Sequence, residues 1–79
     1  MTIINRLITI GEQVFEIKGS ALNHDSSRKN LASWDSLNHL KFFMAIEEGF
    51  DIQFSPEEIA ELDSFASIEV ALKKMNIPF

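Results

Sequence analysis

The residue of this sequence best placed to take part in chemistry is Ser36, which follows Asp35 at the start of the most strongly helical segment. Asp35 is a favoured N-cap, because its carboxylate can accept hydrogen bonds from unpaired N–H groups of the first helical turn. Ser36 then falls in that turn, near the positive end of the helix dipole, where a phosphate on its hydroxyl would be stabilised. The pattern therefore indicates a serine that can carry a phosphodiester; a plain helix start is the simpler alternative.

Other residue types offer no comparable centre. The chain has no cysteine, which excludes disulfides and thiolate metal sites, and His24 and His39 are isolated in the sequence. On a helical wheel, His39 lies beside Phe43 and Ile46, and no carboxylate is spaced on that face to orient it as a base. We therefore expect no metal site and no enzymatic activity.

Length and composition restrict the class of protein. A length of 79 residues predicts a single domain, residues 1–79. The composition, with 46% hydrophobic and 24% charged residues, is typical of a globular chain. The net charge of −5 would repel nucleic acid and would suit basic protein surfaces. Without a membrane-length apolar run or a signal-type N-terminus, we expect a cytoplasmic protein that is monomeric and does not bind membranes.

The first predicted helix covers residues 3–17, with Thr2 as its cap and Gly19 as its end. Its apolar residues share one face, namely Leu7, Ile10, Val14 and Ile17, with Ile3, Ile4, Ile8 and Phe15 nearby. A long connection, residues 18–35, follows. A connection of this length must be attached to the domain, and Leu22, Leu31 and Trp34 are the apolar residues that can attach it.

The central helix is predicted from Ser36 to about Gly49, its expected C-cap, and carries two apolar stripes. One stripe comprises Phe42, Phe43, Ile46 and Phe50, and the other comprises Leu37, Leu40 and Met44. A small bundle needs one stripe for its core, so the second either packs on a neighbouring helix or faces outward as a docking surface. Glu47, Glu48 and Asp51 add negative charge that either meets a basic partner or is simply solvated. His39 points into the bundle or toward the third helix.

Two shorter helices complete the prediction. Ser55, Pro56 and Glu58 form a capping-box pattern at the start of a short third helix, with Ile59 and Leu62 as its buried contacts. The last helix begins at Asp63 or Ser64 and ends before Pro78; its apolar face is Phe65, Ile68, Leu72 and Met75, and Lys73 and Lys74 suit its last turns. The predicted fold is all-α, a small four-helix bundle with a long first loop and a short third helix.

The run Asp35-Ser36-Leu37, followed by an apolar helix that ends Met44-Ala45-Ile46-Glu47-Glu48-Gly49-Phe50, resembles the acyl carrier protein family over almost the whole chain. The resemblance implies that Ser36 bears a covalent 4′-phosphopantetheine, transferred from coenzyme A by a phosphopantetheinyl transferase. Asp35 and Leu37 complete the motif. The thiol of the group would carry acyl intermediates as thioesters between activating ligases, acyltransferases and synthases of a fatty acid, polyketide or specialised pathway.

The resemblance also implies roles for the central helix. Leu37, Leu40 and Met44 match the positions where the family presents apolar contacts to partner enzymes. Glu47 and Glu48 match the family's acidic recognition positions. Phe43, Ile46 and Phe50 match core positions that can border an acyl cavity.

Several residues differ from the pattern of fatty acid synthesis. Asn38, His39 and Lys41 make the start of the helix less acidic, and Trp34 before the motif is more similar to free-standing carriers of specialised biosynthetic clusters. The bulky Phe42 and Phe43 favour a short, polar or aminoacyl cargo. Two alternatives remain: an aminoacyl or peptidyl carrier of a peptide-type pathway, and a helical interaction module without a prosthetic group. A second Asp-Ser pair, Asp63-Ser64, is interpreted as a helix cap because too little chain follows it.

Overall fold

The first segment forms α1 (Ile3–Phe15), whose Ile3, Leu7 and Phe15 are buried. Of the predicted apolar face only Leu7 is buried, and the other three residues are half-buried. The structure is a computed structural model that describes residues 3–75, so the predicted roles of Thr2 and Pro78 lie outside the described residues. The helix ends earlier than predicted because Glu16 turns the chain with a left-handed φ of 54°. Gly19 does not end α1 but opens a short 3₁₀ helix, η1 (Gly19–Ala21).

The central helix, α2 (Ser36–Phe50), begins as predicted. Asp35 has extended backbone angles, and its carboxylate accepts a hydrogen bond from the Asn38 N–H at 2.8 Å. The helix continues through Gly49 to Phe50, so the predicted glycine C-cap is wrong. Asp51 is the C-cap instead, with φ of 56°, and its N–H donates to the Glu47 carbonyl. Aspartate is among the non-glycine residues that most readily adopt this left-handed conformation.

The two remaining helices are α3 (Pro56–Glu61) and α4 (Phe65–Lys74). The capping box of α3 is confirmed, because the Ser55 hydroxyl accepts from the Glu58 N–H and the Glu58 carboxylate accepts from the Ser55 N–H. Ser64 rather than Asp63 caps α4. The predicted burial of Ile59 and Leu62 is only partial, since both are half-buried.

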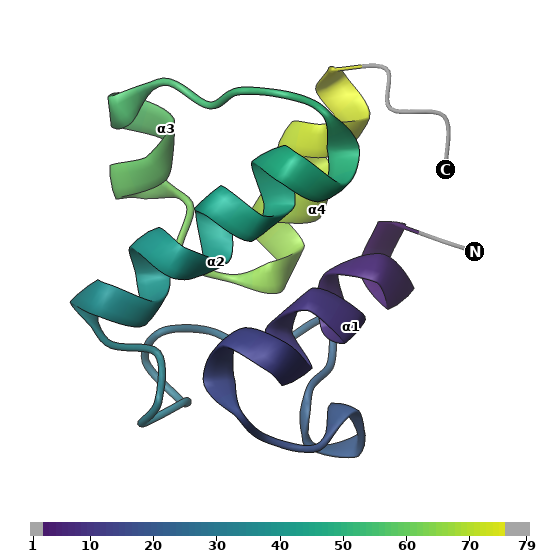
Figure 1. Ribbon diagram of the computed structural model, residues 1–79, viewed down its shortest axis with the longest axis vertical. Coiled ribbons are helices and arrows are strands. Elements are labelled where there is room, and N and C mark those ends of the chain that lie inside the picture. Colours follow the sequence, from purple (N-terminus) through teal and green to yellow (C-terminus); the bar gives the residue numbers. More distant parts are fainter. Residues whose placement is uncertain (1–2, 76–79) are drawn as a thin grey trace.

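The core forms where α1 packs against α2 and α4. Figure 1 shows α2 running diagonally across the molecule, with α1 on one side and the short α3 on the other. Gly11 allows the close approach of α1, because a Cβ there would lie 3.0 Å from the Phe65 ring. The Trp34 ring sits among three phenylalanines, Phe15, Phe42 and Phe65, with centroid distances of 5.1, 5.4 and 5.8 Å.

The long connection between α1 and α2 is attached to the core at Leu22 and Trp34, which are buried, and at Leu31, which is half-buried. It is also attached by backbone hydrogen bonds that the sequence did not indicate. Ser27 and Ser64 form an isolated antiparallel bridge, beside which the Arg28 N–H donates to the Asp63 carbonyl at 2.9 Å. The connection is therefore fixed to the junction between α3 and α4.

Over residues 3–75, the prediction of a small all-α fold of four helices is confirmed. The third helix is short and the first connection is long, as expected. None of the helices described is long and apolar enough to cross a membrane.

Candidate functional site

Ser36 is the first residue of α2, as the sequence predicts, and it is exposed. Its hydroxyl accepts a hydrogen bond from Nη2 of Arg28 at 2.9 Å. The hydroxyl retains its own O–H donor and a second lone pair for another partner. The neighbouring Asp35 carboxylate is directed to the Asn38 N–H within the helix. The site thus combines an accessible hydroxyl with a guanidinium cation.

Arg28 is the site residue that sequence reasoning missed. It lies eight positions before Ser36 in the long connection, so no helical or strand spacing links the two residues. The contact depends on the backbone bonds that hold residues 26–28 against the start of α4. The available sequence signal was weak, a basic pair at residues 28–29 in an otherwise polar loop.

A groove of about 630 Å³ opens beside Ser36, between α2 and α3. The surface exposed in the groove is mostly apolar, although five of its ten lining residues are polar or charged: Arg28, Ser36, His39, Glu47 and Gln53, beside Leu40, Phe54, Pro56, Ile59 and Ala60. Phe43, Ile46 and Phe50 do not line this groove, because all three are buried in the core, as predicted. A role for them at the border of an acyl cavity remains a prediction.

The apolar stripe of Leu37, Leu40 and Met44 faces outward. These side chains are 62%, 53% and 67% exposed, whereas Phe42 and Phe43 of the other stripe are buried. Of the two alternatives for this stripe, packing on a neighbouring helix or facing outward, the structure shows the second. Its use as a docking surface remains a prediction.

The two glutamates near the end of α2 differ in their surroundings. Glu47 is half-buried, and its carboxylate accepts a hydrogen bond from the Phe54 N–H at 2.8 Å. This contact gives Glu47 a structural role in the loop after α2 that the sequence did not indicate. Glu48 is exposed. The recognition role assigned to both residues remains a prediction, and Glu48 is the more accessible of the two.

His39 connects α2 to the loop before it and to α3. Its side chain is buried, Nδ1 lies 2.9 Å from Nε1 of Trp34, and Nε2 lies 2.6 Å from the Ile59 carbonyl. The indole N–H can only donate, so Nδ1 accepts and Nε2 carries the proton that is donated to Ile59. Both ring nitrogens thus have structural hydrogen-bond partners.

This bridge predicts that His39→Phe lowers the free energy of unfolding by about 2–3 kcal/mol, because Trp34 Nε1–H and the Ile59 carbonyl would lose their partner. Urea denaturation followed by circular dichroism would measure the change. His39→Gln is the matched control, because its amide retains an oxygen acceptor and an N–H donor. Equal losses in the two variants would contradict a role for the hydrogen bonds.

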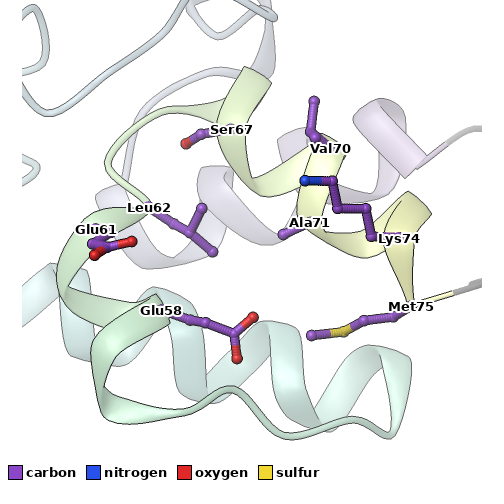
Figure 2. A pocket seen from close by; sticks show the side chains of 8 residues that line it. All are labelled: Glu58, Glu61, Leu62, Ser67, Val70, Ala71, Lys74 and Met75. Atoms are coloured by element: carbon purple, nitrogen blue, oxygen red, sulfur yellow. The ribbon is translucent and has the colours of Figure 1, made fainter.

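A second groove, of about 460 Å³, lies between α3 and α4 (Figure 2). Figure 2 shows the residues that line it: Glu58 and Glu61 of α3 and the following Leu62 on one side, and Ser67, Val70, Ala71 and Lys74 of α4 with the following Met75 on the other. The Glu58 carboxylate is already used in the α3 capping box. Among residues 3–75, no group of histidines and carboxylates is arranged to hold a metal ion.

Ser64, the serine of the second Asp-Ser pair, has a different environment from Ser36. It is half-buried, and its hydroxyl accepts from the Ser67 N–H at 3.1 Å and lies 3.0 Å from the Ser67 hydroxyl. The interpretation of Ser64 as a helix cap is confirmed. Comparison with known proteins adds no further assignment, since no protein-family model matches the chain and no curated protein is significantly similar to it.

Proposed function

We propose that this chain is a carrier protein that holds acyl intermediates as thioesters on a 4′-phosphopantetheine attached to Ser36. The observation that supports the proposal is the position of the Ser36 hydroxyl, exposed at the start of α2, bound by Arg28 and beside an apolar groove. The residues fit the group chemically. An exposed hydroxyl supplies the attachment point, and the amides of Ser36 and Leu37 have no acceptor within the helix and favour an anion.

Attachment requires a balanced exchange at phosphorus. The Ser36 oxygen forms a bond to the phosphorus that bears the pantetheine, and the bond from that phosphorus to the bridging oxygen of coenzyme A breaks. Adenosine 3′,5′-bisphosphate leaves with the electron pair, and the hydroxyl proton passes to a base of the transferase. The bound group then supplies a terminal thiol for thioester chemistry. This chain contributes the nucleophilic oxygen and the surface that enzymes recognise.

The surroundings of Ser36 favour a short, polar or aminoacyl cargo. Phe42 and Phe43 fill the interior next to α2 and are 0% and 1% exposed. The groove beside Ser36 includes the polar side chains of Glu47 and Gln53. A carrier of a specialised biosynthetic pathway, including one with aminoacyl intermediates, matches these features better than a carrier of long fatty chains.

A helical interaction module is the second candidate, and the exposed stripe of Leu37, Leu40 and Met44 favours it. In this alternative, the stripe binds a partner helix and Ser36 remains unmodified. The two functions share the stripe and differ only in the fate of the Ser36 hydroxyl.

The test is to incubate the chain with coenzyme A and a broad-specificity phosphopantetheinyl transferase and to measure the intact mass. We expect a single phosphopantetheine adduct, which proteolysis should locate on the peptide that contains Ser36. Circular dichroism would verify that the protein is folded. If a folded protein takes no adduct from several transferases, the interaction module is the better description.

A further inference from the structure

We propose that Arg28 binds the phosphate of the group attached to Ser36 and directs that group toward the groove between α2 and α3. In the unmodified chain, its guanidinium already donates a hydrogen bond to the Ser36 oxygen, the atom that would become the ester oxygen. This inference rests on the proposed function, because it requires a phosphodiester at Ser36.

The backbone holds Arg28 firmly in position for this contact. Its N–H donates to the Asp63 carbonyl at 2.9 Å, and the preceding residue, Ser27, is bridged to Ser64. The carbonyl of Ser26, which is buried, accepts from the Phe65 N–H at 3.0 Å. The Arg28 backbone is therefore attached to the start of α4, and the side chain spans the distance to the first residue of α2.

The charge of Arg28 lacks an anionic partner in the part of the chain that the structure describes. The chain has a net charge of −5, yet within residues 3–75 the close contacts found between carboxylates and basic side chains are those of His24 with Asp25 and Glu69, which are ion pairs only when the histidine is protonated. The guanidinium instead binds a neutral hydroxyl. Guanidinium groups bind phosphate oxygens more strongly than neutral acceptors, through charge-assisted and often paired hydrogen bonds. A phosphodiester at Ser36 would place such oxygens two bonds beyond the atom that Arg28 already contacts, on the phosphorus bonded to it.

The position of Arg28 would also set the direction in which the attached group leaves Ser36. Arg28 and Ser36 both line the groove between α2 and α3. A phosphate held by the guanidinium would therefore lie on the groove side of Ser36, and the chain attached to it would begin toward Leu40 and Ile59. The same contact would place a cation beside the phosphorus during transfer.

The experiment compares Arg28→Gln and Arg28→Lys with Lys29→Gln, a matched control that removes the same charge from the next exposed residue. We expect Arg28→Gln to slow attachment about tenfold at low carrier concentration, the effect of losing one hydrogen bond to a charged group. Lys29→Gln should change the rate by less than about twofold. Arg28→Lys should lie between them, because lysine retains the charge without the fork of donors.

A second readout excludes an effect on transferase docking. The ³¹P resonance of the purified, loaded protein should move in Arg28→Gln and stay unchanged in Lys29→Gln, and the side-chain ¹⁵N–¹H signal of Arg28 should shift on loading. Urea denaturation would verify that the variants are as stable as wild type.

Slow loading with an unchanged ³¹P resonance would overturn the inference, as would wild-type behaviour of Arg28→Gln in both readouts. If the wild-type chain takes no adduct, the proposed function fails as well; if it loads at Ser36 and Arg28→Gln behaves normally, only this inference fails.

Discussion

Ser36→Ala is expected to abolish attachment of phosphopantetheine while changing the free energy of unfolding by less than about 0.5 kcal/mol. The proposed function assigns the only nucleophilic oxygen of the attachment to this side chain. Its hydroxyl is exposed, and its hydrogen bond comes from an exposed arginine, so its removal leaves no buried group unpaired. Alanine is also a favourable residue inside a helix. Intact mass after incubation with coenzyme A and a transferase would measure attachment, and urea denaturation would measure stability.

Ser64→Ala provides the matched control, because Ser64 also follows an aspartate and lies directly before a helix, as its N-cap. Here the expected effects are reversed. Attachment should be retained, whereas the free energy of unfolding should fall by about 1 kcal/mol, since the Ser64 hydroxyl caps α4 through the Ser67 N–H. An adduct on Ser36→Ala, or its loss in Ser64→Ala, would contradict the assignment of the attachment site.

Trp34→Ala is expected to lower the free energy of unfolding by about 4 kcal/mol, the cost typical of removing a buried aromatic side chain. Trp34 is 2% exposed, contacts the rings of Phe15, Phe42 and Phe65, and donates to His39. A domain of this size has a total stability of roughly 4–12 kcal/mol, so the variant should lose a large part of it. Because Trp34 is the single tryptophan, circular dichroism rather than fluorescence must follow unfolding.

Two controls separate the contributions of Trp34. Trp34→Phe retains an aromatic ring but removes the donor to His39, so it should cost less than the alanine variant and more than a surface change. Leu37→Ala is the surface reference, because Leu37 is 62% exposed, and it should change stability by less than about 0.5 kcal/mol. If Trp34→Ala were no more destabilised than Leu37→Ala, the placement of Trp34 in the core would be wrong.

The features that sequence analysis predicted correctly depend on residues close together in the chain. The Asp35 cap lies three residues from the N–H that it binds, and the Ser55–Glu58 capping box has the same spacing. Helical periodicity separated the buried stripe from the exposed one, although it could not decide which of the two faced solvent. The errors at Gly19 and Gly49 also have a local cause. Glu16 and Asp51, rather than glycine, adopt the left-handed conformation after α1 and α2.

Other features of the site depend on the tertiary structure. They connect residues that are far apart in the chain, so no helical or strand spacing predicts them. Three such features are the Arg28–Ser36 contact, the hydrogen bond between His39 and the Ile59 carbonyl, and the groove between α2 and α3. All three depend on how the long connection and the short α3 pack beside α2. The position of the connection follows from burial of Leu22 and Trp34 and from the bridge between Ser27 and Ser64. Thus the sequence alone identified the candidate serine, because a helix start is a local feature. The tertiary fold determined the cation and the groove beside it, because packing and backbone pairing act between segments distant in the chain.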